Sequence, residues 1–355
     1  MGRMDSVKKP LSYKEAGVDI DTADAAKRKM AALLGGPRAG VLNALGAFGS
    51  LYDARFEGYK HPVLVLKMEE PGSKQLLALQ HGRVESLCYD LVNHIVNDVA
   101  VMGAEPLAML DTIVCGKLEH DVVVAIVDGL RRACDDLGFP LVGGETSEQP
   151  GVLAPGTYVL SAALIGIVEK EHVIDGSRIR PGDTLLALAS NGLHTNGYTL
   201  VRRLLADDPQ LAHAPVEGPG GGEPFLEAIL RPHLCYLPGL RSIFRHPGLH
   251  GLAHITGGGI GDNLRRILPG GVAARVDLGR VRVLPVFRAI REAGSVPDPE
   301  MIRTYNLGVG MVAVVASDEA AAIADTLAQA GYEAYPIGHV EEGDGAVRFE
   351  GSLQW

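Results

Sequence analysis

The sequence predicts an α/β protein with two domains, because strand-like and helical runs alternate along the chain and the alternation restarts near its middle. The first half contains such runs at 62–66, 85–102, 120–137 and 157–168. The second half repeats the pattern with runs at 182–189, 198–205, 261–267 and 310–315. We therefore expect domains at 1–173 and 174–355, with residues 1–21 as a flexible arm.

Composition and charge narrow the class of protein. The 355 residues are 46% hydrophobic and 21% charged, which is typical of a globular protein with a sizeable core. A formal net charge of −10 argues against a basic surface for nucleic acid or for an anionic membrane. Because there is neither an apolar leader nor an apolar run of membrane-spanning length, we expect a cytoplasmic protein.

Two further features concern cysteines and a loop. The four cysteines are isolated, so the sequence predicts reduced thiols and neither a disulfide framework nor a zinc knuckle. Residues 215–224 are rich in glycine and proline, which predicts an exposed flexible loop inserted into the second domain.

The helix predicted at 85–102 carries a polar stripe. Asp90, His94, Asn97 and Asp98 fall on one side at about 100° per residue, while the other sides are apolar. A helix of this kind is expected to be largely buried, and buried carboxylates need a metal, a cation or several donors. An exposed polar stripe on an amphipathic helix is the alternative.

Paired glycines follow the apolar run at 139–142. Gly143 and Gly144 allow close approach of a ligand to the backbone, and Glu145 is a ligand type suited to a hard cation. A bare turn would look similar. Together with the acidic helix, however, these residues form a plausible magnesium-nucleotide constellation.

The second half contains two glycine-containing entries into helices, at 190–198 and 254–263. Free amides at a helix N-terminus suit a phosphate, whereas Thr195 or Asn196 acting as a simple cap is the alternative. His194 and His254 are candidates for acid–base or phosphate-binding groups, although a lone histidine is more often structural. The sequence has no P-loop, kinase signature or dinucleotide fingerprint, so any ATP binds on another scaffold.

The motifs, taken in order, resemble the aminoimidazole ribonucleotide synthetase family, also called phosphoribosylformylglycinamidine cyclo-ligase, over nearly the whole chain. They lie at 12–20 (SYKEAGVDI), 46–49 (GAFG), 90 with 96–98 (D and VND), 103–106 (GAEP), 116–118 (GKL), 143–151 (GGETSEQPG), 194–198 (HTNGY), 256–259 (TGGG) and 303–311 (RTYNLGVGM).

The resemblance implies a fold and a reaction. The expected fold is a homodimer whose N-terminal domains share a β-barrel, with C-terminal α/β domains closing over the site. The implied reaction is the ATP-dependent conversion of formylglycinamidine ribonucleotide to aminoimidazole ribonucleotide, with Mg²⁺ as the metal. Phosphorylation of the amide oxygen creates a leaving group, and a nitrogen of the same molecule then closes the ring.

The resemblance also implies roles for individual residues. The expected catalytic residues are Lys14, Asp98 and His194. The expected metal ligands are Glu69, Asp90, Asp98 and Glu145. The residues expected to bind ATP are Lys74, Asn97, Gly143, Gly144, Glu145 and Thr146. The residues expected to bind substrate are Thr195, Asn196, Gly197, Thr256, Gly257, Gly258 and Gly259.

One loop departs from the family pattern. Where the family usually has Thr-Asp-Gly-Val-Gly-Thr-Lys, this chain has MEEPGSK at 68–74, so Glu69 replaces an aspartate and Lys74 keeps the lysine. Glu70 adds negative charge beside an anionic ligand, and Pro71 removes a backbone donor. Asn93 and His94 also stand where the family is usually small and apolar. The alternatives are a paralogue with another ATP-dependent substrate and a non-catalytic binding subunit.

Overall fold

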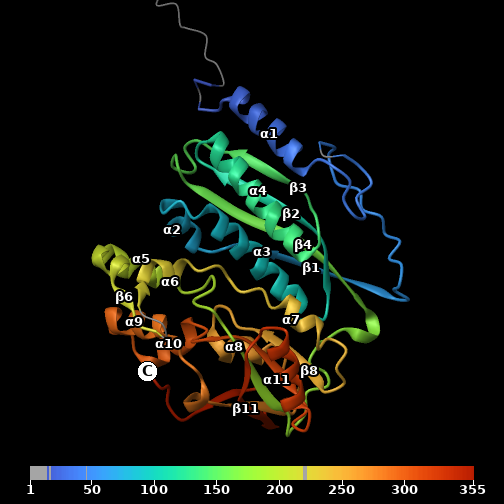
Figure 1. Cartoon of the computed structure of the whole chain (residues 1–355), viewed down its shortest axis with the longest axis vertical. Coiled ribbons are helices and arrows are strands. Elements are labelled where there is room, and N and C mark those ends of the chain that lie inside the picture. The colour runs from blue at the N-terminus through green and yellow to red at the C-terminus, as the bar shows by residue number, and fades with distance from the viewer. Residues whose placement is uncertain (1–13, 16, 45, 219–221) are drawn as a thin grey trace, which may run out of the picture.

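The computed structural model describes residues 14–15, 17–44, 46–218 and 222–355. Figure 1 shows an N-terminal layer of helices and sheet above a C-terminal α/β unit. The mixed α/β architecture with two domains is therefore confirmed, since each half has a sheet of its own. The exact boundary near residue 174 stays a prediction.

The N-terminal domain is built on a four-stranded sheet of order β1-β4-β2-β3. Its strands are β1 (Pro62–Glu69), β2 (Glu105–Cys115), β3 (Leu141–Glu148) and β4 (Tyr158–Glu169). Its helices are α1 (Ile20–Leu34), α2 (Lys74–Gln80), α3 (Val84–Ala100), α4 (His120–Leu137) and the short η1 (Lys170–His172). Helix α3 packs against β1, β4 and β2, and α4 packs against α3, so one face of the sheet is covered by helices.

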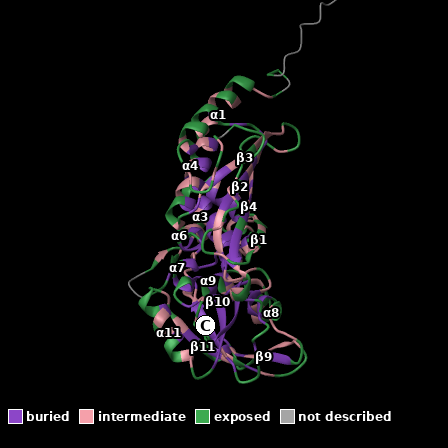
Figure 2. Cartoon of the chain, turned by 90° about the vertical axis from the view of Figure 1, so that its right-hand side faces the viewer, coloured by how far each residue is buried: buried purple, intermediate pink, exposed green. Residues whose placement is uncertain are grey.

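The other face of this sheet is apolar and open. Along β1, exposed and half-buried side chains alternate, which places Leu64, Leu66 and Met68 on the uncovered side. Leu110 on β2 and Ile165 on β4 continue this surface. Figure 2 shows the helices on one side of the strands and exposed or half-buried ribbon on β1.

The C-terminal domain is built on a six-stranded sheet of order β12-β9-β11-β5-β10-β8. Its strands are β5 (Thr184–Ala189), β8 (Leu249–His254), β9 (Val272–Asp277), β10 (Val309–Val315), β11 (Ala334–Glu342) and β12 (Val347–Glu350). The α-helices are α5 (Tyr198–Asp207), α6 (Phe225–Leu230), α7 (Leu237–Arg241), α8 (Gly259–Arg265), α9 (Pro285–Gly294), α10 (Asp298–Thr304) and α11 (Ala320–Gln329). Two short helices complete the domain, η2 (Pro209–His213) and η3 (Leu278–Arg280).

Two expectations need correction. The glycine-rich segment is not simply a loop, because its ends pair as β6 (Pro215–Val216) and β7 (Glu223–Pro224), and Val216 is buried; residues 219–221 lie outside the described residues. The expected arm also ends early, since α1 begins at Ile20, where the Asp19 carboxylate accepts a hydrogen bond from the Thr22 amide. Residues 1–13 lie outside the described part of the chain.

The helix expected to be buried is buried. Most side chains of α3 are inaccessible, including the polar Asp90, Asn93, His94 and Asn97. In the described part of the chain, no helix combines the length and the apolar character needed to cross a membrane.

Candidate functional site at the domain interface

Helix α3 directs its polar stripe towards the C-terminal domain. Asp90 lies at its centre and is fully buried with Lys74, whose Nζ is 2.7 Å from Asp90 Oδ1. The Lys74 ammonium also donates to the carbonyls of His194 (3.0 Å) and Arg231 (2.7 Å). Burial raises the pKa of Asp90 to about 6, against the pull of Lys74. The pair therefore ties α3 and α2 to two C-terminal segments.

The same stripe anchors the segment between α6 and α7. Asp90 Oδ1 accepts a hydrogen bond from the His233 amide at 2.8 Å. Asn93 Nδ2 donates to the His233 carbonyl, and Asn97 donates to the Leu234 carbonyl while accepting from the Tyr236 amide. These bonds satisfy the backbone of an irregular buried segment, which otherwise carries a desolvation cost.

A carboxylate pair forms between Asp98, about two turns beyond Asp90 on α3, and Glu69 at the end of β1. Glu69 Oε2 and Asp98 Oδ2 share the Lys67 ammonium at 3.0 and 2.9 Å. Burial alone raises the pKa of Asp98, but the hydrogen bonds from His254 and Lys67 outweigh it and hold the pKa well below its usual range. The Lys67 ammonium therefore shows that a cation can lie between the carboxylate oxygens of Glu69 and Asp98. This donor set is chemically suited to Mg²⁺.

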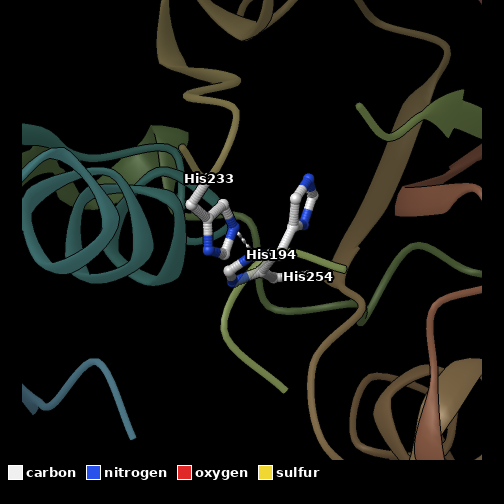
Figure 3. Close-up of side chains that lie close together, drawn as sticks. All are labelled: His194, His233 and His254. Carbon is white, nitrogen blue, oxygen red and sulfur yellow. Dashed lines mark hydrogen bonds between the residues drawn. The ribbon is translucent and has the colours of Figure 1, made fainter. Parts of the chain in front are cut away.

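Two histidines, His94 and His254, lie beside this pair, and two more pack against them. We call His94, His194, His233 and His254 the histidine cluster; Figure 3 shows three of them gathered together. His254 Nδ1 is 2.7 Å from Asp98 Oδ1, and His254 Nε2 is 3.0 Å from His233 Nε2. Thr195 Oγ1 contacts His94 Nδ1 at 3.0 Å and His233 Nδ1 at 3.4 Å.

Burial controls protonation within the histidine cluster. It lowers the pKa of His94 to about 4, with the neighbouring His254 acting in the same direction. Burial likewise holds the pKa values of His194 and His233 well below the usual range. These three imidazoles are therefore neutral near pH 7, and each has a nitrogen lone pair.

Residues 143–146, which are expected to bind ATP, lie far from Glu69 and Asp98 within one chain. Glu69 and Gly144 occupy the same row across the sheet, but β4 and β2 separate them, which corresponds to about 14 Å at the usual strand spacing. Glu145 is exposed and is in register with Thr112, which places it on the open face. One chain therefore does not bring Glu145, or its neighbours Gly143 and Thr146, to Glu69 and Asp98.

The glycine at position 144 is explained by packing alone, without a ligand. A Cβ there would stand 2.6 Å from the Asp111 carbonyl oxygen on the neighbouring strand, so the strand pairing itself requires a glycine at this position. Gly143 has no such restriction, because its nearest neighbours lie at ordinary contact distance.

The two loops expected to bind substrate lie side by side. A Cβ on Gly257 would stand 3.2 Å from Asn196 Oδ1, and Asn196 Nδ2 is buried without a partner among the described residues. Gly197 has φ +80° and packs on the Tyr305 ring, so a side chain does not fit there. Gly258 and Gly259 also adopt positive φ and are crowded, which leads the chain from Thr256 into α8.

The loop at 68–74, which departs from the family pattern, contacts the substrate loop at 194–197. Gly72 has φ +61°, and a Cβ there would stand 3.3 Å from the Thr195 carbonyl oxygen. Pro71 is buried and Glu70 is exposed. Lys14, in contrast, is ion-paired with Asp19 at 2.6 Å before α1, which Figure 1 shows at the end far from the C-terminal domain.

Sequence reasoning missed Lys67 and His233. Lys67 is one residue of an alternating strand, and His233 belongs to an irregular segment without a motif. Both lie in the site because segments far apart in the sequence pack together, and no local motif predicts such contacts.

Comparison with known proteins identifies relatives in both halves. Residues 61–168 match the model of the AIR synthase related protein N-terminal domain, and residues 180–350 match that of its C-terminal domain. A phosphoribosylformylglycinamidine cyclo-ligase from Aromatoleum aromaticum is 42% identical, with 99% of each chain covered. One from Geobacillus kaustophilus is 40% identical, with 96% of this chain and 98% of the relative covered.

Solved structures share the fold at lower identity. Thiamine-monophosphate kinase from Stenotrophomonas maltophilia has a TM-score of 0.65 at 20% identity, covering 95% of this chain and 98% of that one. HypE from E. coli has a TM-score of 0.66 at 18% identity, covering 93% and 94%.

Proposed function

Because the chain belongs to the AIR synthase related family, we propose that it is a phosphoribosylformylglycinamidine cyclo-ligase. It converts formylglycinamidine ribonucleotide to aminoimidazole ribonucleotide with ATP, in purine biosynthesis. The observation that carries the proposal is the full-length similarity to cyclo-ligases at about 40% identity. The motifs of α3 also meet those at 194–198 and around 256 at the domain interface, where Thr195 contacts His94 and His254 contacts Asp98. We place the reaction in the cytoplasm.

Mg²⁺ and ATP are part of this proposal. Glu69 and Asp98 would hold the metal where the Lys67 ammonium now lies between them. Bound Mg-ATP supplies the phosphoryl group that turns the substrate's amide oxygen into a leaving group. The metal roles of Asp90 and Glu145 stay predictions, since Asp90 is paired with Lys74 and Glu145 is on the open face of the sheet.

The chain's own residues position the substrate. The adjoining loops at 194–197 and 256–259 offer the unpartnered Asn196 amide and backbone amides to a ribose phosphate. The domain interface holds the reacting amide and amine of one substrate molecule in contact. Such positioning contributes roughly 7–11 kcal/mol to an intramolecular ring closure.

A homodimer completes the proposed site. The sheet leaves Leu64, Leu66 and Met68 uncovered, and Glu145 lies on this same open face. A second copy packed on it would close the two sheets into a barrel, as the family resemblance implies. It would also supply residues of the 143–146 loop to the site of its partner.

Genetic rescue tests the function most directly. The gene should restore growth without purines to a bacterium lacking its own cyclo-ligase, and the purified protein should release ADP only with formylglycinamidine ribonucleotide and Mg²⁺. Asp98→Ala should lower this rate about 100-fold, since it removes a charged group at the reacting site. Asp207→Ala, which removes an exposed carboxylate paired with Arg203, is the matched control and should keep full activity.

Two results would redirect the proposal. ATP turnover with a different acceptor and no rescue would identify a paralogue, for which the Glu70-Pro71 change is the supporting feature. A folded protein that binds neither ATP nor formylglycinamidine ribonucleotide in calorimetry would be a non-catalytic subunit.

A further inference from the structure

Three imidazoles of the histidine cluster converge in the C-terminal domain beneath α3. His194 lies before α5, His233 lies between α6 and α7, and His254 ends β8, so the three come from separate segments. One ring nitrogen from each lies within 4.8 Å of the other two. All three side chains are almost completely buried, at 1%, 1% and 5% exposure.

His194 provides an independent indication of a ligand. Neither of its ring nitrogens has a hydrogen-bond partner among the described residues, although the side chain is buried. A buried imidazole without a partner carries a desolvation cost, and such groups in native proteins call for an explanation. His194 is also held at φ +61°, in the left-handed region that a non-glycine residue seldom adopts.

The surroundings provide the outer contacts that metal-binding histidines need. His254 Nδ1 donates to Asp98, because a carboxylate can only accept, and this leaves Nε2 for a metal. Thr195 Oγ1 lies beside His233 Nδ1 and can accept its proton, which leaves His233 Nε2 for the same metal. Asp98 therefore faces the histidines with Oδ1 and the Lys67 ammonium with Oδ2.

We propose that His194, His233 and His254 form a site for one divalent transition ion of the Zn²⁺ class. Imidazole nitrogens favour Zn²⁺ and its neighbours over Mg²⁺, which prefers oxygen ligands. In a tetrahedral site with Zn–N bonds of 2.0–2.1 Å, the nitrogens lie about 3.4 Å apart. His233 Nε2 and His254 Nε2 are already 3.0 Å apart, whereas His194 stacks on His233 with ring centres at 3.9 Å and must tilt to join them.

The metal ion can bind without any loss of protons from the protein, because the proton that it displaces moves to another nitrogen. In the free protein, His233 Nε2 and His254 Nε2 lie 3.0 Å apart with one proton between them. Binding moves that proton to His233 Nδ1, where Thr195 Oγ1 accepts it, and the Thr195 hydroxyl donates to His94 Nδ1. The ion would cross-link three segments of the C-terminal domain that support the substrate loops.

A second ligand set shares one residue with the first. His94, Asp98 and His254 also offer ligand atoms within 4.8 Å of one another. Lys67 already neutralises Asp98 there, and both His94 and His254 have hydrogen-bond partners. The set containing the unpartnered His194 is therefore the better site.

Calorimetry on the full-length, chelator-treated protein tests the site. We expect one Zn²⁺ per chain, and a higher melting temperature with Zn²⁺ than without it. His233→Gln should abolish binding, and Asp98→Asn, which removes the negative charge beside His254 Nδ1, should weaken it about 10–100-fold. The matched control is His250→Gln, a buried histidine paired with Asp183, which should bind one Zn²⁺ normally.

X-ray absorption at the zinc edge needs no variant and covers the case in which His233→Gln does not fold. The spectrum of the wild-type protein should show three imidazole ligands at 2.0–2.1 Å. The proposal is overturned if the wild-type protein binds no Zn²⁺. It is also overturned if fewer than three imidazoles are found, or if His94→Leu rather than His233→Gln removes the ion. These readouts do not involve ADP release, so they stand or fall separately from the proposed function.

Discussion

The Lys74 ammonium has three oxygen acceptors and no contact with solvent. The family resemblance implies that Lys74 binds ATP, yet here its ammonium donates to Asp90 and to two carbonyls of the C-terminal domain. Removing one partner of a buried ion pair is strongly destabilising, because the other charge is left buried without compensation. Lys74 therefore acts first as a link between the domains, and its role towards ATP stays a prediction.

Removing that ammonium should be costly. We expect Lys74→Met to lower the free energy of unfolding by about 3–5 kcal/mol, since it leaves the Asp90 carboxylate buried and unpaired. The double variant Lys74→Met/Asp90→Leu should lose less than the sum of the single variants. Urea unfolding of the four proteins measures this coupling, and strict additivity would contradict the link.

A second buried carboxyl, Asp111 on β2, predicts a dependence of stability on pH. Burial raises its pKa to about 7, above the value of 3.8 for a free side chain. Between these values the folded state holds a proton that the unfolded state has lost, so this group makes stability fall as pH rises, by at most about 1.4 kcal/mol per pH unit. Above pH 7 the buried group is ionised and its full cost is present.

Asp111→Asn removes this dependence. The variant should therefore gain stability relative to the wild type at pH 8, and gain much less at pH 5. Urea unfolding at both pH values tests the sign, with the exposed Asp136→Asn as a control that should show no such difference. An equal effect of Asp111→Asn at pH 5 and pH 8 would show that Asp111 does not titrate in this range.

At the scale of elements, local signals predicted the regular structure well. The helix expected at 120–137 has these bounds, because Gly138 ends it at φ +84°, a conformation that glycine adopts without strain. The helix expected at 261–267 begins two residues earlier, since Gly258 and Gly259 turn the chain into it at positive φ. The family resemblance is confirmed as well, because its motifs are local runs of sequence.

The contacts that build the site could not be predicted in the same way. The polar stripe predicts that Asp90 needs a metal, a cation or several donors, but only the fold shows that Lys74 and the His233 amide fill this role. His233 is 140 residues from Asn93 and 21 from His254, so no spacing rule connects them. Periodicity identifies which side of a helix is polar, but not which distant segment that side contacts.

The proposed function places ATP near the loop between β1 and α2, so the charge on this loop should affect nucleotide binding. Glu70 is exposed beside Glu69, and its charge would lie close to the phosphates of ATP. We expect Glu70→Gly to lower the KM for ATP about fivefold, corresponding to roughly 1 kcal/mol for one charge at about 4 Å in water. Steady-state ADP release measures this effect.

Glu70→Gln separates charge from backbone freedom, because it keeps the side chain and removes only the charge. The two variants should behave alike if charge is the cause. A KM that falls in Glu70→Gly alone would instead assign the effect to the flexibility of glycine. A KM that does not change in either variant would place the phosphates away from this loop.

At the scale of the whole molecule, helices cover one face of the four-stranded sheet, and on the other face the described chain leaves the side chains around Leu66 uncovered, with Ser50 beside Gly143 near the β3 edge. Leu66 is 73% exposed and Met68 67% exposed on this open face, with Leu64, Leu110 and Ile165 around them. Contiguous apolar surface of this kind marks an interface, and a two-fold axis brings the same surface of two copies together. The proposed site needs this arrangement, since Glu145 and Asp98 lie on different sides of one sheet.

A charged residue at the centre of the open face of the four-stranded sheet should both dissociate the dimer and inactivate the enzyme. We expect Leu66→Glu to be monomeric in analytical ultracentrifugation, because two buried carboxylates would face each other across the two-fold axis. Since Leu66 points away from α3 and the histidine cluster, the monomer should keep its secondary structure but lose ADP release. Ile20→Glu, at an exposed apolar position on α1, should remain dimeric and active. A fully active Leu66→Glu monomer would show that one chain contains the whole site, and the 143–146 loop would then need another role.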